Sequence, residues 1–267
     1  MEATLRGAWV VAYRELVRFV RERSRMFSSL LMPLLFLVIF GAGFNRIIGA
    51  VTPGVDFVQF IYPGIIAMNT LMNSVMSGLS VVWDREFGFL KEILVAPLGR
   101  TGIVLGKVAG SATIAVGQGI LLLVLAPIVG VRLTPLMVIE LVPLLVIMSV
   151  SLSALGVLMA SRMRSQQGFQ ILVQLTIFPL IFLSGVFFPV NNVPAWLEVV
   201  SKLNPLTYGV SAIRQLFLGS SSLLPAGNPL GITVFGHTMT ILEDVLILAA
   251  FGALMLALAA WSFGRQE

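Results

Sequence analysis

Residues 83–100 concentrate ionisable side chains between two long apolar runs. They read WDREFGFLKEILVAPLGR, so acids and bases alternate with phenylalanines and leucines. At a helical period Phe87, Leu90 and Leu94 share one face, and the following proline ends the helix. The pattern predicts an amphipathic helix over residues 84–96. Such a helix either rests on a membrane surface or inserts its apolar face into a groove of a soluble partner, and charges of both signs favour the protein contact.

Uncharged polar side chains recur in two of the apolar runs. One stripe has spacings of four, four and three residues, and it consists of Asn69, Asn73, Ser77 and Ser80. Met68, Met72 and Met76 lie beside this stripe, while Gln167, Gln170 and Gln174 descend another helix face toward Phe178. Amides are costly toward lipid, so both faces should point at protein or at a cavity. Two interpretations stay open: hydrogen bonding between helices, or the lining of a path for an amphiphilic molecule.

The sequence gives little support for a nucleotide-binding site or a metal site. The segment TGIVLGKVAG, residues 101–110, departs from a phosphate-binding loop, because Thr101 replaces its first glycine and Val108 replaces its magnesium-binding hydroxyl. Its glycines have the spacing that lets two helices approach closely, and they are Gly102, Gly106 and Gly110. His237 is the single histidine of the chain, and one histidine alone does not indicate a metal site.

The elements that position these residues are membrane helices. The chain has 267 residues, of which 58% are hydrophobic and 11% charged, less than half the charge of an ordinary soluble domain. Six apolar runs are long enough to cross a bilayer. We place them at residues 27–48, 57–82, 103–129, 136–160, 169–189 and 241–263. We therefore expect an all-α polytopic membrane protein, with residues 1–267 forming one domain.

Lysine and arginine set the expected orientation. They are enriched before the first run and in the segments after the second and fourth, which predicts cytoplasmic positions for those segments and for both termini. Because the basic residues flank membrane runs, they argue against a nucleic-acid partner. The absence of cysteine excludes disulfides.

Two further elements are expected outside the bilayer core. Residues 1–25 should form a helix on the membrane surface, with two faces of different character. Its apolar face holds Trp9, Tyr13, Leu16 and Val20, and the face expected to meet lipid headgroups holds Arg14, Arg18, Arg21 and Arg25. Residues 190–218 predict two short helices on the outer side, in a re-entrant or interfacial hairpin.

Two motifs resemble those of one known family, the permease subunits of type-2 ABC exporters. DREFGFLKEILVAPLGR resembles the cytoplasmic coupling helix of that family, and FLSGVFFPVNNVPAWLEVVSKLNPLTYGVSAIR resembles its fifth span and outer hairpin. The order of elements is also similar over nearly the whole chain. The second motif is most similar in form to permeases that export drugs, antibiotics and nodulation-type lipo-oligosaccharides.

The resemblance implies roles for named residues. Contact with an ATPase would involve Asp84, Arg85, Glu86, Phe87, Gly88, Leu90, Lys91, Glu92 and Leu94. The translocation path would be lined by Asn69, Met72, Asn73, Met76, Ser77, Gln170, Gln174 and Phe178. An outer gate would include Phe188, Pro189, Trp196, Asn204, Pro205, Tyr208 and Arg214.

The resemblance also implies partners and a function. Two ATPase subunits would bind ATP and magnesium, none of which this chain would hold, and a second identical permease would complete the membrane part. We expect export of an amphipathic drug, antibiotic or lipid-like molecule across the cytoplasmic membrane of a prokaryote. A lipid-linked oligo- or polysaccharide is the alternative cargo. An ion-coupled transporter or a membrane enzyme should show acids or histidines deep in the spans, whereas Glu140, Glu243 and Asp244 lie near span ends.

Overall fold

Helices dominate the fold, which we describe from a computed structural model covering residues 2–21, 28–39, 57–88, 100–131, 133–187, 190, 193–219, 231–234 and 237–264. The first half contains α1 (Glu2–Arg21), a helix at Ser28–Ile39, α3 (Phe57–Met76), α4 (Leu79–Glu86), α6 (Arg100–Leu125) and the 3-10 turn η1 (Ala126–Val129). The second half contains α7 (Pro135–Arg162), α8 (Gln166–Phe182), α9 (Ala195–Leu203), α10 (Pro205–Gly219), β1 (Thr233–Val234), β2 (His237–Thr238) and α11 (Ile241–Gly264).

Four helical segments are long and apolar enough to cross a membrane. They are Val58–Glu86, Thr101–Val129, Pro135–Arg162 and Ile241–Phe263. These segments match the second, third, fourth and sixth predicted runs, so the expectation of an all-α polytopic membrane protein is confirmed. The first and fifth predicted runs overlap shorter apolar helices, Ser28–Ile39 and Gln166–Phe182. Residues 40–48 of the first run lie outside the described residues.

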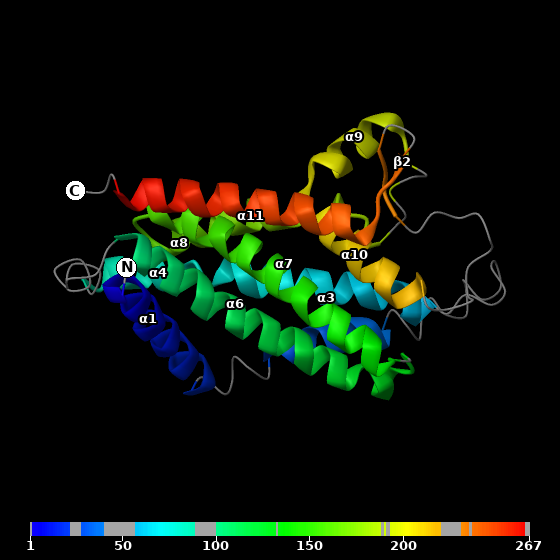
Figure 1. The fold of residues 1–267 in the computed structure, drawn as a ribbon, viewed down its shortest axis with the longest axis horizontal. Coiled ribbons are helices and arrows are strands. Elements are labelled where there is room, and N and C mark those ends of the chain that lie inside the picture. The colour runs from blue at the N-terminus through cyan, green and yellow to red at the C-terminus, as the bar shows by residue number, and fades with distance from the viewer. Residues whose placement is uncertain are drawn as a thin grey trace.

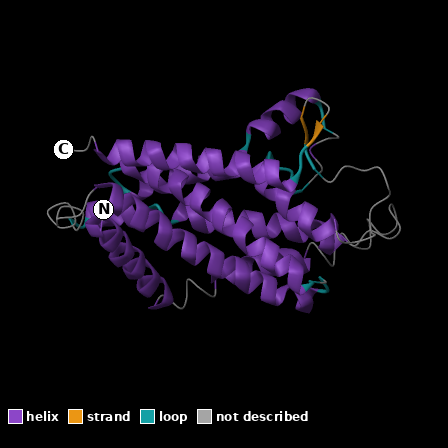
Figure 2. Cartoon of the chain, in the orientation of Figure 1, coloured by secondary structure: helices purple, strands orange, loops and turns teal. Residues whose placement is uncertain are grey.

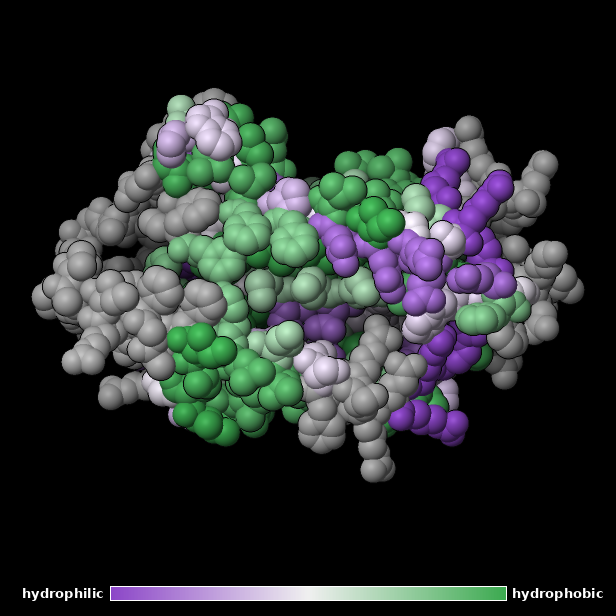
Figure 3. Space-filling model, turned by 180° about the vertical axis from the view of Figure 1, so that it is seen from behind, coloured by the Kyte–Doolittle hydropathy of each residue, from purple (hydrophilic) through white to green (hydrophobic). Residues whose placement is uncertain are grey.

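Helix α7 lies in the middle of the bundle and packs against α3, α6 and α11 (Figure 1). Both chain termini lie at one end of the long axis, whereas α9 and the small antiparallel β1–β2 pair lie at the other (Figures 1 and 2). From behind, hydrophilic side chains gather at the end that holds the termini, and apolar surface covers much of the rest (Figure 3). An apolar exterior with one strongly polar end is the surface expected of a helix bundle in lipid.

Helix α4 continues α3 after a turn at Ser77 and Gly78, and this joint crosses α7 at very close range. A Cβ on Gly78 would lie 2.3 Å from Gly156 O, and a Cβ on Gly156 would lie 2.5 Å from Val75 O. No side chain fits between the two backbones, so glycine is required on both helices. The contact fixes where the α3–α4 unit crosses the central helix.

Helix α1 packs along α6 over the predicted glycine stripe. A Cβ on Gly106 would lie 2.7 Å from Ala8 O, and one on Gly110 would lie 2.9 Å from the Cβ of Glu15. Close helix packing is therefore confirmed at these two glycines. Trp9 and Tyr13 on the opposite face are exposed, as expected of a helix that touches lipid.

The predicted pair of short helices after α8 is confirmed as α9 and α10. Helix α10 packs against α3 and α11, while α9 projects from the bundle with Trp196 and Leu203 exposed (Figure 1). The two helices therefore differ in environment: α10 belongs to the core, and α9 lies at the surface.

Candidate functional site

The last turn of α4, residues Trp83–Glu86, joins four other helices; we call this turn and the side chains that contact it the α4 junction. The helix ends there because Gly88 adopts a left-handed backbone with φ of 81°, and Phe87 caps the turn by donating its N–H to Trp83 O. The prediction of one helix over residues 84–96 is therefore wrong at its start, because Asp84–Glu86 belong to α4. Four of the predicted coupling residues lie outside the described residues, namely Leu90, Lys91, Glu92 and Leu94.

Asp84 is the acidic centre of the junction and is only 4% exposed. Lys107 of α6 donates to Asp84 Oδ2 at 2.5 Å, to Glu15 Oε1 at 2.6 Å and to Ser80 Oγ at 3.1 Å. Arg14 of α1 donates to the same Asp84 oxygen at 2.7 Å. Buried charges persist only when they are paired and hydrogen-bonded, as these are.

Burial and two neighbouring carboxylates shift the pKa of Arg14 in opposite directions. Burial alone would lower the pKa of its guanidinium, but the charges and hydrogen bonds of Asp84 and Glu15 outweigh this effect and raise it above its ordinary value. The charged form of Arg14 is thus stabilised. Arg14 was expected on the headgroup-facing side of α1, and its half-exposed guanidinium contacts Asp84 and Glu15.

Arg85 and Trp83 link the junction to α7 and α8. Arg85 donates to Met163 O at 2.5 Å and to Ser161 O at 2.8 Å, which satisfies carbonyls left unpaired at the end of α7. Trp83 Nε1 donates to Oε1 of Gln166, the first residue of α8, at 2.9 Å. The junction therefore connects α4 to the ends of two further helices.

Arg18, another residue expected on the headgroup-facing side of α1, contacts Trp83. Its guanidinium lies 4.5 Å from the centroid of the Trp83 ring, a cation–π contact between α1 and α4. Arg21 is exposed at the end of α1, and Arg25 lies outside the described residues.

The last residue of α4 and the two residues after it face outward. Glu86, Phe87 and Gly88 are exposed, and Phe87 has 69% of its surface accessible. The described coupling residues thus divide into two groups: Asp84 and Arg85 bind neighbouring helices of this chain, whereas Glu86–Gly88 are exposed.

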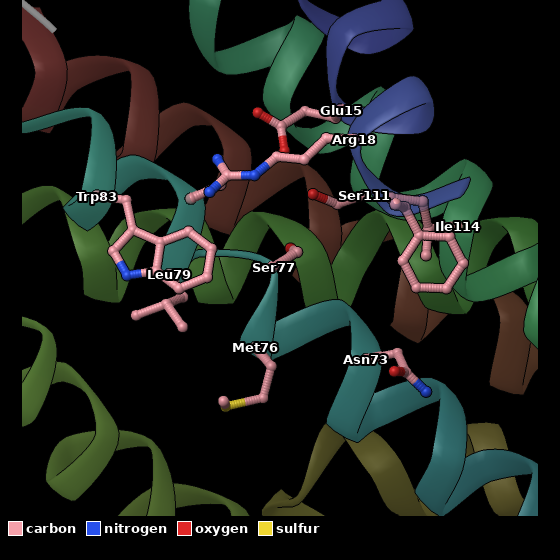
Figure 4. A pocket seen from close by; sticks show the side chains of 11 residues that line it. Glu15, Arg18, Asn73, Met76, Ser77, Leu79, Trp83, Ser111 and Ile114 are labelled. Carbon is pink, nitrogen blue, oxygen red and sulfur yellow. The ribbon is translucent and has the colours of Figure 1, made fainter. Parts of the chain in front are cut away.

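The polar stripe of α3 has two environments. Asn69 is buried and donates to Ser29 O at 3.0 Å, and Asn73 donates to the Asn69 side chain at 2.9 Å. This supports helix–helix hydrogen bonding at Asn69. Asn73 and Ser77 instead line an open pocket with Met76, whereas Met72 is exposed (Figure 4).

The predicted path residues of α8 lie mostly on its exterior. Gln174 and Phe178 are exposed and Gln170 is half-buried. Phe178 stacks on Phe182, with ring centroids 6.4 Å apart. Among the residues that the structure describes, Gln174 and Phe178 therefore point away from the rest of the bundle.

The predicted gate residues at and before α10 are anchored to the C-terminal end of α8. Arg214 is buried, donates to Gly185 O at 2.8 Å and lies 4.5 Å from the Phe60 ring centroid. Asn204, which precedes Pro205 at the start of α10, donates to Leu180 O at 2.7 Å. Both side chains satisfy carbonyls near the C-terminus of α8.

Of the remaining gate residues, Tyr208 donates to Lys202 O at 2.7 Å and ties α10 to α9. Trp196 is exposed on α9. Phe188 and Pro189 lie outside the described residues.

Sequence reasoning missed Glu15, Lys107 and Gln166 as members of the site. Lys107 offered a signal, because a lone lysine within an apolar run requires a buried acidic partner. Glu15 offered a weaker signal, since it is an acidic residue directly beside the arginine face of α1.

Known proteins similar to this chain are membrane permeases. The family described as ABC-2 type transporter matches residues 6–218. The transport permease ycf38 of Cyanophora paradoxa is 30% identical over 218 residues, covering 80% of this chain and 75% of that protein. A protein named as the multidrug ABC transporter permease YbhR of Escherichia coli K12 is 31% identical over 178 residues, covering 64% of this chain and 47% of YbhR. The inner membrane transport permease YadH of the same strain is 27% identical over 234 residues, 87% of each chain.

Proposed function

The chain belongs to the ABC-2 type transporter family and is a multi-pass membrane permease subunit rather than an enzyme; from this premise we propose that it is the membrane part of an ATP-driven exporter. Family membership implies pairing with an ABC ATPase subunit. Two ATPases and two identical permease copies would form the complex, with ATP and magnesium held by the ATPases. Six spans would cross the bilayer, the helices at Ser28–Ile39 and Gln166–Phe182 belonging to the first and fifth.

The α4 junction is the observation that carries this proposal. Movement of the segment after Gly88 would be transmitted to α4 and, through Asp84, Arg85 and Trp83, to α1, α6, α7 and α8. Buried ion pairs and carbonyl caps resist separation, so these helix ends would move together. The exposed Phe87 and the residues that follow it would supply the contact with the ATPase.

The orientation would place the α4 junction in the cytoplasm and α9 outside, in the inner membrane of a prokaryote. Support comes from the positive-inside distribution of arginines and from the hydrophilic surface at the end that holds the termini (Figure 3). The name of the relative YadH, an inner membrane transport permease, agrees with this location.

The cargo would be an amphipathic drug, antibiotic or lipid-like molecule. The α3 stripe offers amide and hydroxyl groups beside flexible methionines, a combination that suits varied amphiphiles. The relative YbhR is named a multidrug permease, which favours this class. A lipid-linked oligosaccharide is the alternative cargo.

The second permease copy would complete the path. Helix α8 exposes Ile171, Leu175 and Phe178 together with Gln174, and a facing copy would bury this surface. Gln170, Gln174 and the α3 stripe would then line one passage between the copies. Arg214 and Asn204 would hold the outer gate against α8.

The experiment that tests the pairing compares two exposed apolar positions at opposite ends of the bundle. Phe87→Asp should abolish co-purification of the ATPase, because a charge replaces the apolar contact. Leu203→Asp on α9 is the matched control and should leave the complex intact. Retention of the ATPase by the Phe87 variant would refute the coupling role of this end of the bundle.

A further inference from the structure

Asp244 is a fully buried acid in the first turn of α11, where this helix packs against α10 (Figure 1). Its Oδ2 accepts a hydrogen bond from Gln215 Nε2 of α10 at 3.0 Å. Its Oδ1 is buried without a hydrogen-bond partner among the residues that the structure describes. An ionised carboxyl group at this position would therefore present two charged acceptor oxygens to a single neutral donor.

The cations near this end of the bundle are engaged elsewhere. Lys202 of α9 pairs with Glu198, and Arg214 of α10 donates to carbonyls at the end of α8. Asp84 at the other end of the bundle, by contrast, has the ammonium of Lys107 at 2.5 Å. No such ion pair reaches Asp244 from the described part of the chain, and a buried carboxylate without a paired cation is costly. A bound proton removes that cost.

The other ionisable groups around Asp244 add no positive charge to it. Tyr208 of α10 and Glu243 of α11 interact electrostatically with Asp244, and both are acids. His237 of β2 contacts the Glu243 carboxylate, on the exposed side of the helix end. Glu140 of α7 is exposed. These neighbours therefore favour the neutral form of the buried acid over the carboxylate.

The polar contact between α10 and α11 is tightly packed. Gln215 Nε2 lies 3.1 Å from Ser211 Oγ, 3.3 Å from Met239 O and 3.0 Å from Asp244 Oδ2. The backbone of Gly231 closes the contact, because a Cβ there would lie 2.4 Å from Met239 O and 3.3 Å from Gln215 Nε2. Such packing suits a proton as the ligand of Asp244 better than a hydrated cation.

We propose that Asp244 is a proton-binding site, and that its proton holds α10 against α11. The neutral acid keeps the hydrogen bond from Gln215 and gains a hydroxyl that can donate to the neighbouring Ser211. Loss of the proton leaves a carboxylate with too few donors inside a closed contact. The contact is therefore firm at low pH and weakens as the pH rises.

The consequence concerns the end of the bundle that carries α9. In the proposed orientation this end faces the outside, so a rise in external pH would loosen α10 from α11. The site itself rests on burial and hydrogen bonds within this chain, and it does not depend on an ATPase.

Infrared spectroscopy detects the proton directly, because a protonated carboxyl group absorbs at a higher frequency than a carboxylate. An exposed aspartate has lost its proton at about pH 6. At that pH the purified permease should show the band of a protonated carboxyl, and Asp244→Asn should lack it. Glu140→Gln replaces an exposed acid and should retain the band. Absence of the band from the parent chain, or its persistence in Asp244→Asn, would overturn the proposal.

A buried thiol reports whether the proton holds the two helices together. Leu248 is fully buried and packs with Tyr208 at the contact, and the chain has no native cysteine. Raising the pH from about 6 to about 8 should accelerate maleimide labelling of Leu248→Cys at least about tenfold more in the parent background than in Asp244→Asn. Comparing the same thiol in both backgrounds cancels the pH dependence of the thiol itself.

The neighbouring acid supplies the matched control. Glu243→Gln neutralises a carboxylate one residue away and can still accept from Thr240 N, so it should keep the pH response. Equal responses in the parent and Asp244→Asn backgrounds would refute the role of the proton, as would loss of the response in Glu243→Gln.

If Asp244→Asn does not fold, the parent background alone decides. The infrared band should disappear over the same pH range in which Leu248→Cys becomes reactive, and two separate ranges would contradict the proposal. All of these measurements use purified permease without an ATPase. A negative result therefore leaves the proposed pairing untouched, and loss of that pairing leaves this result unaffected.

Discussion

The ammonium of Lys107 lies 2.5 Å from Asp84 Oδ2, although these two side chains come from different helices and are almost completely buried. The same nitrogen contacts Glu15 on α1, so one lysine joins three elements. The acid expected to face an ATPase is thus part of the internal framework of the permease.

Replacing Lys107 should leave the buried carboxylates of Asp84 and Glu15 without enough positive charge to neutralise them. Lys107→Met is expected to destabilise the protein by about 3–5 kcal/mol. Thermal unfolding in detergent, followed by size-exclusion chromatography, measures the loss. Lys202→Met removes the partly exposed Lys202–Glu198 pair on α9 and should cost about 1 kcal/mol or less. Similar losses in both variants would contradict the buried-cluster interpretation.

Arg85 should be required for order at the end of α7. Arg85→Leu leaves Met163 O and Ser161 O without this donor, at a cost of about 1–3 kcal/mol. We expect faster amide hydrogen exchange around residues 160–165. Glu86→Leu at the exposed neighbouring position is the control and should leave exchange there unchanged. Equal protection in wild type and Arg85→Leu would refute the cap.

The crossing of α4 and α7 should reject even one methyl group. Gly78→Ala places a Cβ 2.3 Å from a backbone oxygen, and the resulting overpacking should cost about 1–3 kcal/mol. Gly117→Ala, where no neighbouring atom lies within 4 Å, should be neutral or stabilising, because alanine favours helix. Thermal melting curves of the two variants, recorded in parallel, compare their stabilities. A Gly78→Ala variant as stable as the parent chain would disprove the close crossing.

Arg214 should keep α10 packed against the C-terminal end of α8. The chain has no native cysteine, so Ser184→Cys at a buried position beside the anchor is a unique reporter. It should resist maleimide in the parent chain and become reactive when Arg214→Met removes the donor to Gly185 O. Arg162→Met, at the other end of the bundle, should leave it unreactive. If Ser184→Cys still resists maleimide in the Arg214 variant, contacts other than this hydrogen bond hold α10 against α8, and the prediction is wrong.

Local pattern predicted the helices well because apolar length and helical period are properties of neighbouring residues. The fourth run was expected at 136–160, and α7 spans Pro135–Arg162. Its proline at the first helical position and its Thr134 cap are local features. The crossing partner of Gly156 was not predictable in this way, because one glycine within a run does not identify the helix that it meets.

The site was predicted less well, because its chemistry depends on contacts distant in sequence. The face that contains Arg14 follows from spacing, but its partner Asp84 is separated from it by 70 positions. The end of α4 did have a local signal: Gly88 interrupts an otherwise helical pattern, as a left-handed helix end requires. That glycine separates Asp84–Glu86 from the residues that follow.

The Gly78–Gly156 crossing has a mechanical consequence. It divides the segment Val58–Glu86 into arms of eight and twenty residues, about 12 Å and about 30 Å long at ~1.5 Å per residue. Were the segment to tilt about this point as a rigid rod, each ångström of displacement at Glu86 would become roughly 2.5 Å in the opposite direction at Val58. A small displacement of the polar end would then produce a larger displacement at the opposite end of the segment.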